Sequence, residues 1–166
     1  MKAFCVDTSG FSNPLEYMPQ DIHPSVWAKV MEIIARGEIA VTTEIYQEMT
    51  HIPGALGDCI KQHKGDLVME IAKGHWDWQG YVSQTNAMNA AHHAFISEYS
   101  GGSARTISLN DLSIVALAKT LGIPLVSMEV SAKPSVTKRR IPDVCQIESV
   151  KHISFSDFLR ANNIRV

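Results

Sequence analysis

Two acidic residues in this sequence directly follow apolar runs that are typical of buried β-strands. Asp7 comes after the apolar residues of "FCVDTSG", and Glu129 comes after "IPLVSM". Short apolar runs between turn-forming residues predict buried strands. Ligands of open α/β sheets bind beyond the carboxyl ends of the strands, so both carboxylates stand where chemistry is expected. Each also has a simpler interpretation, Asp7 as the cap of a turn and Glu129 as an acid in a loop.

Further acids lie on predicted helices that begin at the same edge of such a sheet. Asp111 falls in the first turn of a helix predicted over 108–122. Its simpler interpretation is that of a cap residue with no further role. Glu44 and Glu48 lie one turn apart on the helix that follows the second strand, so they share a face. Glu44 also suits a first helical turn because it interacts favourably with the helix dipole.

Carboxylates that gather at one edge without matching lysines repel one another. A divalent cation relieves this repulsion, and oxygen ligands select Mg²⁺ or Mn²⁺. The sequence therefore predicts a metal site, and its four ligands are Asp7, Glu48, Asp111 and Glu129.

Strands and helices alternate along the chain. Strands are predicted at 2–7, 38–41 and 123–128 and in "HISF", residues 152–155, with helices in the segments between them. Alternation of this kind favours a parallel sheet with helices on both faces. We expect a three-layer α/β/α sandwich with a central, mostly parallel sheet.

Helical patterns extend over 55–73 and 81–99, and a polar loop is predicted over 131–143. In the helix that starts near Pro24, the residues predicted to share the buried face are Val26, Trp27, Val30, Ile33 and Ile34.

Composition limits the class of protein. The 166 residues suit one domain, 1–166, and the net charge of −2 gives no global field for nucleic acid, so binding of a polyanion needs a local patch. The three cysteines form no CxxC pair, and neither a membrane span nor a signal peptide is predicted. We expect a soluble cytoplasmic protein. Glycine-rich nucleotide-binding motifs and the GxSxG elbow are missing from the sequence.

Three segments together resemble the PIN-domain family. They are "FCVDTSGF", "AVTTEIYQEM" and "LNDLSIVALAKTLGIPLVSME", and they come in the family's order. The later "KRRIPDVC" is similar to a bacterial subgroup of PIN-like proteins. The resemblance covers roughly the whole chain and implies a PIN-like fold.

The resemblance also implies roles for single residues. Asp7 matches the family's first acid, with Ser9 as its hydroxyl neighbour, and Glu48 matches the second because it precedes an apolar residue; Glu44 is the reserve choice. Asp111 matches the third acid. Glu129 stands where the family more often has Asp, which puts a second metal position in doubt.

The implied activity is that of a metal-dependent endoribonuclease, and many family members are VapC-type toxins of toxin–antitoxin pairs. RNA is then the substrate, and an antitoxin and a second copy of the chain are candidate partners. A non-catalytic module that binds RNA or protein is the alternative. A phosphotransfer domain with Asp7 as its nucleophile is a third reading, which the serine at position 9 disfavours.

A positive run stands after the last acid. Residues 137–140, "TKRR", form the densest positive run in the chain. Lys138, Arg139 and Arg140 are predicted to bind RNA phosphates, because arginine pairs well with phosphate oxygens. The alternative interpretation is a solvated loop.

Overall fold

The chain folds around a parallel sheet whose strands all end at one edge. The computed structural model describes residues 1–101 and 106–166. Its strands are β1 (Phe4–Val6), β2 (Ile39–Ala40), β3 (Leu125–Val126) and β4 (His152–Ile153), in the order β2-β1-β3-β4. Every pairing between them is parallel. The predicted α/β class and parallel sheet are confirmed, with strands shorter than predicted.

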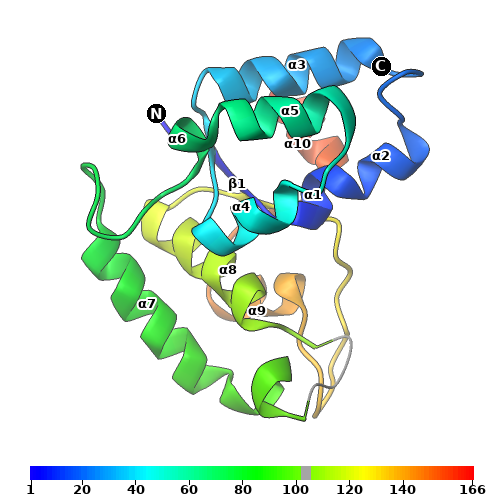
Figure 1. The fold of residues 1–166 in the computed structure, drawn as a ribbon. Coiled ribbons are helices and arrows are strands. Elements are labelled where there is room, and N and C mark those ends of the chain that lie inside the picture. Colours follow the sequence, from blue (N-terminus) through cyan, green and yellow to red (C-terminus); the bar gives the residue numbers. More distant parts are fainter. Residues whose placement is uncertain (102–105) are drawn as a thin grey trace.

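Two helices cover one face of the sheet, α3 (Pro24–Ala35) and α10 (Phe155–Ala161) (Figure 1). Aromatic side chains join them to each other and to β1. The ring of Trp27 stacks on Phe155 with 5.3 Å between centroids, and Phe4 meets Phe158 edge-on at 5.1 Å. The predicted buried face of α3 is confirmed: all five of its residues are buried.

The opposite face carries α8 (Leu109–Leu121) and α9 (Ile141–Ile147), and α7 (Trp78–Ala91) packs on the outer side of α8 (Figure 1). Seven consecutive residues of α8, from Leu112 to Ala118, are buried. A helix that is buried all round lies inside a protein. Here α8 fills the space between the sheet and α7, which completes the three predicted layers.

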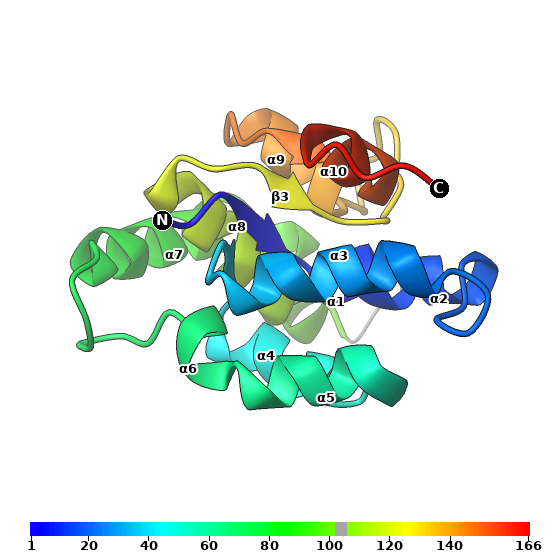
Figure 2. The same cartoon turned by 90° about the horizontal axis from the view of Figure 1, so that it is seen from above.

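The remaining helices flank the sheet beyond β2 or join its parts. They are α1 (Thr8–Ser12), α2 (Pro14–Tyr17), α4 (Thr43–Met49), α5 (Gly54–Gln62), α6 (Lys64–Leu67) and the 3-10 turns η1 (His93–Phe95) and η2 (Ser97–Tyr99). In the view from above, α5 and α6 lie on one side of α3, and α10 lies on the opposite side of α3 (Figure 2).

Three predicted boundaries are wrong. The helical pattern over 55–73 ends at Leu67, and the pattern over 81–99 gives way to 3-10 turns after Ala91. The loop predicted over 131–143 ends at Arg140, because Pro142 suits the first turn of α9. Among the residues that the structure describes, no helix has both the length and the apolar character needed to cross a membrane.

A close approach at Gly10 fixes where α1 lies. A Cβ atom at this position would stand 2.8 Å from the carbonyl oxygen of Val126 in β3. Glycine therefore allows α1 to begin directly after β1 and to press against the end of β3. This contact holds Asp7, the residue between β1 and α1, at the carboxyl edge of the sheet.

Candidate functional site

Asp7 joins the sheet to α1. Its backbone N–H donates to the carbonyl of Val126 at 2.9 Å, which extends the pairing of β1 with β3. Its Oδ2 accepts from the backbone N–H of Ser9 at 3.1 Å and from the Ser9 hydroxyl at 2.6 Å. Asp7 is thus the N-cap of α1, whereas the simpler interpretation of the sequence had it capping a turn. It is also buried, with 4% of its surface exposed, which is unusual for a residue that only caps a helix.

Glu48 is hydrogen-bonded to Thr8, the residue after Asp7, and to Asn110, the residue before Asp111. Its Oε2 accepts from the hydroxyl of Thr8 at 3.0 Å, and its Oε1 accepts from the side-chain amide of Asn110 at 3.5 Å. Thr42 caps α4 and so sets the start of the helix that carries Glu48. Glu48 itself is exposed to solvent, so it can meet a ligand from outside.

Asp111 is fixed by the start of α8. Ser108 and Asp111 form a capping box, in which the Ser108 backbone N–H donates to Asp111 Oδ2 at 2.9 Å and the Asp111 N–H donates to Ser108 Oγ at 3.1 Å. The cap interpretation is therefore also correct for Asp111. Capping sets the direction of a side chain and leaves its second carboxylate oxygen available for another role.

Glu129 follows β3 and is turned toward the start of α9. Its Oε2 accepts from the backbone N–H of Ile141 at 3.0 Å. The residue before it, Met128, donates its backbone N–H to Ser9 Oγ at 3.1 Å, so Ser9 bonds both Asp7 and the end of β3.

Three of the four predicted acids line one cleft. The cleft has a volume of about 520 Å³, and its lining residues belong to α1, α4 and α8 or directly adjoin them. These three helices lie near the end of β1 (Figure 1). Asp7, Glu48 and Asp111 line it, and so does Glu44, the reserve choice. Glu129 is not among the lining residues. The structure therefore places three predicted acids and Ser9 together and leaves Glu129 to one side.

Burial and mutual repulsion make these carboxyl groups hard to ionise. Burial raises the pKa of Asp7 to about 7, and the charges of Asp111 and Glu129 act in the same direction. The pKa of Asp111 is raised by burial and then by Glu48 and Glu98. The pKa of Glu129 is raised by burial and by Asp111, while Arg140 opposes the shift. Such shifts are common at functional sites.

The donor set suits a hard divalent cation, because carboxylate oxygens are the ligands that Mg²⁺ and Mn²⁺ prefer. The geometry is more open than a finished metal site. Within residues 1–101 and 106–166, no three acidic, histidine or cysteine side chains come close enough together to hold a metal ion. Each predicted acid instead takes a hydrogen bond from a protein donor beside it. The chemistry of the residues fits a cation, and closure around it would need the side chains to move.

The positive run divides into residues with different surroundings. Lys138 is exposed. The guanidinium of Arg139 lies over the ring of Phe95, 3.7 Å from its centroid, and donates to His92 Nδ1 at 2.8 Å. Arg140 is close enough to Glu129 to lower the pKa of that acid.

Several residues of the cleft escaped prediction. Thr8 and Asn110, which hold Glu48, are neighbours in sequence of Asp7 and Asp111, and this adjacency was the available signal. His51 and Gln47 also line the cleft. They lie close to Glu48 in sequence, but a lone exposed histidine at a helix end has no distinctive pattern.

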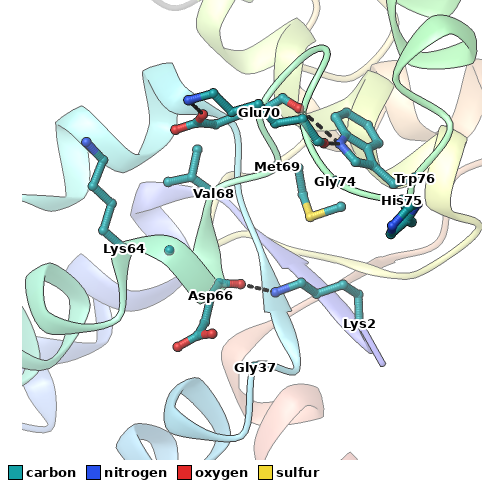
Figure 3. Close-up of a pocket in the computed structure, with 12 residues that line it drawn as sticks. Lys2, Gly37, Lys64, Asp66, Val68, Met69, Glu70, Gly74, His75 and Trp76 are labelled. Carbon is teal, nitrogen blue, oxygen red and sulfur yellow. Dashed lines mark hydrogen bonds and ion pairs between the residues drawn. The ribbon is translucent and has the colours of Figure 1, made fainter.

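A larger hollow, of about 700 Å³, is lined by Lys2, Gly37 and residues between Lys64 and Trp76 (Figure 3). Lys2 and Gly37 precede β1 and β2, and the four predicted acids are not among the lining residues. The ammonium of Lys2 donates there to the carbonyls of Ile39 and Asp66. Lys73 pairs with Glu70, and Lys64 lies 5.5 Å from the centre of the Tyr46 ring. Each of these three amines thus has a partner within the protein.

Replacing Asp7 with Asn should stabilise the metal-free protein in a pH-dependent way. The folded-state pKa is about 7, whereas an unfolded Asp titrates near 4. Stability from this group is present below about pH 4 and is lost as the pH rises toward 7. The variant lacks this loss, so its advantage in free energy of unfolding should grow across that window, to at most about 4 kcal/mol. Urea denaturation in EDTA across this pH range measures it.

Asp58→Asn, a change at an exposed residue of α5, is the matched control and should change the free energy of unfolding by no more than about 0.5 kcal/mol. An advantage of Asp7→Asn that is independent of pH would contradict the assignment.

No curated protein matches the chain. Among solved structures, a chain of VapBC-1 from nontypeable Haemophilus influenzae is similar, with 13% identity and a TM-score of 0.42, over 93% of this chain and 98% of that chain. The family described as "Domain of unknown function (DUF4411)" matches residues 4–166. The chain belongs to the DUF4411 family.

Proposed function

We propose that this protein is a metal-dependent endoribonuclease of the PIN type. One observation carries the proposal: Asp7, Glu48 and Asp111, predicted as a set from their order in the sequence, line a single cleft at the carboxyl edge of the sheet. Ligand sites of open α/β sheets lie at this edge. The resemblance of the three ordered segments to the PIN family supports the same reading.

Asp7, Glu48 and Asp111 would hold Mg²⁺ or Mn²⁺. Glu129 accepts from the backbone of Ile141 and would have to turn toward the cleft to join them. When bound, such a cation lowers the pKa of a water molecule and offsets charge on the scissile phosphate. Neighbouring residues of the chain set the orientation of these acidic side chains. Ser9 fixes Asp7, Thr8 and Asn110 fix Glu48, and Ser108 fixes Asp111. Burial raises the pKa of Asp7 to about 7, so Asp7 would have to lose its remaining proton in order to hold a cation at neutral pH.

The substrate is a polyanion and the protein is net negative, so RNA must be attracted locally. The segment 131–140 leaves the carboxyl edge after Glu129 and carries Lys138 in an exposed position. We assign phosphate binding to Lys138 and Arg140. Arg139 remains a predicted RNA contact, but its guanidinium is already engaged by His92 and Phe95.

The toxin reading extends this proposal. VapC-type toxins share the PIN pattern that the three segments resemble, and an antitoxin protein and a second copy of the chain would then be partners. A cytoplasmic location fits this role.

A non-catalytic module that binds RNA or protein is the second candidate. It is favoured by the open geometry, since the described residues bring no three ligating side chains within reach of one ion. Metal-dependent cleavage separates the two candidates.

Purified protein should cleave single-stranded RNA in Mn²⁺ and lose this activity in EDTA. Asp7→Asn should reduce the rate by about two orders of magnitude or more, because loss of residues that merely support metal ligands already costs 10–100-fold. Gel analysis of labelled RNA, with circular dichroism to verify folding, makes the measurement. Full activity in a folded Asp7→Asn variant would contradict the proposal.

Glu48→Gln and Glu44→Gln form the matched pair for this experiment. Both acids line the cleft, but Glu48 is the one bonded to Thr8 and Asn110, so its replacement should cost far more activity. Equal losses would mean that both acids bind the cation.

Lys138→Ala and Arg139→Ala should separate RNA binding from stability. Lys138→Ala should weaken binding of all RNA sequences alike and flatten its salt dependence by roughly one unit of slope. Arg139→Ala should instead lower stability by about 1–3 kcal/mol, because it leaves Nδ1 of His92, a fully buried residue, without its donor. Fluorescence anisotropy at several salt concentrations and thermal melts provide the two readouts. An unchanged salt slope in Lys138→Ala would return the loop to the solvated reading.

A further inference from the structure

A second hollow adjoins the acidic cleft and shares a wall with it. Thr8, Glu48 and His51 line both spaces. The second hollow has a volume of about 320 Å³, at the small end of the roughly 300–1,000 Å³ range of small-molecule sites. Its other walls include the apolar side chains of Leu15 and Ile52.

The walls of this hollow are held in place before any ligand arrives. The hydroxyl of Thr8 donates to Glu48 at 3.0 Å, and this hydrogen bond joins two of the side chains that line both spaces. On the far side, the Gln20 side chain donates to the carbonyl of Pro53 at 3.0 Å and accepts from the backbone N–H of Leu56 at 2.8 Å. Gln20 therefore clamps the segment that follows α4 against the segment that follows α2.

The chemistry of the lining suits a flat apolar ring with a polar edge. Leu15 and Ile52 offer apolar surface, and Ser12 and Glu16 supply hydrogen-bonding groups. His51 is exposed and borders both spaces, so its imidazole can stack on a ring that enters. Recognition of single-stranded RNA uses the same combination, in which unstacked bases lie on aromatic or histidine side chains and bond through their edges.

We propose that this hollow binds the nucleobase next to the phosphodiester bond that the acidic cleft cleaves. The inference rests on the proposed ribonuclease function and adds a base-binding subsite to it. A phosphate and the base of the adjoining nucleotide are covalently linked, so they need binding sites that adjoin each other. The shared wall of Thr8, Glu48 and His51 provides such neighbours.

The test uses a short single-stranded RNA and versions of it that carry one abasic ribose at each position in turn. Where the intact RNA is cleaved, its cleavage site is mapped first. For the wild-type protein, one abasic position beside the cleaved bond should raise KM roughly tenfold with little change in kcat, since stacking of one base contributes an effect of about this size. Removing bases elsewhere should have much smaller effects.

Ser12→Trp places a bulky ring at the hollow and should remove the difference in KM between intact RNA and RNA that is abasic beside the cleaved bond. Its KM for intact RNA should rise roughly tenfold, to the value for the abasic RNA. Leu15→Asn, which takes away apolar wall, gives the same test if Ser12→Trp does not fold. Ile71→Asn changes an exposed apolar residue far from the hollow and should behave as wild type.

Binding of the same labelled RNAs in Ca²⁺, followed by fluorescence anisotropy, keeps the inference separate from catalysis. If the RNAs are bound with the single-position abasic effect but never cleaved, the subsite stands and the ribonuclease proposal fails. If RNA is cleaved but no abasic position matters, or the hollow variants bind intact RNA like wild type, the subsite is overturned and the ribonuclease proposal stands. A hollow that serves a protein partner instead would give this second result.

Discussion

A buried carboxylate at the end of the first strand is the constraint on which the rest of this structure depends. Asp7 extends the pairing of β1 with β3 and caps α1, and the charges of Asp111 and Glu129 help to raise its pKa. Its ionisation is opposed by burial, so the metal-free fold carries a cost at this point. A cost of this kind, at the edge where parallel strands end, is typical of functional sites, which often sacrifice stability. The close approach of Gly10 to Val126 shows how tightly the backbone encloses it.

The other charges are arranged around this constraint. Each acid near Asp7 is oriented by a hydrogen bond from an adjacent segment, so the repulsion among them is met by local donors and not by lysines. In the positive run after Glu129, the charge of Arg140 opposes the raised pKa of that acid. Arg139 is engaged internally by His92 and Phe95. The acidic cleft and the apolar hollow beside it then form one continuous surface between α1, α2 and the end of α4.

Sequence patterns predicted what depends on local periodicity and order. The four strands and the buried face of α3 could be predicted from the spacing of apolar residues. The gathering of Asp7, Glu48 and Asp111 could be predicted because the carboxyl ends of parallel strands share an edge. Helices α1 and α2 were not, since four or five residues are too few to show a period. The engagement of Arg139 by His92 joins residues 47 positions apart, which no local pattern reveals. The turn of Glu129 toward Ile141 depends likewise on where α9 begins.

The central claim is that these carboxylates form a cation site, and calorimetric titration with Mn²⁺ tests it most directly. Performed at about pH 7 in two buffers of different ionisation enthalpy, the titration reports both binding and the protons released. We predict saturable binding with release of up to about half a proton, because the pKa of Asp7 is about 7 and the ligand must be ionised. Asp7→Asn should remove the saturable heat and the proton release together. No saturable binding to the wild-type protein, or an identical titration of Asp7→Asn, would contradict the account.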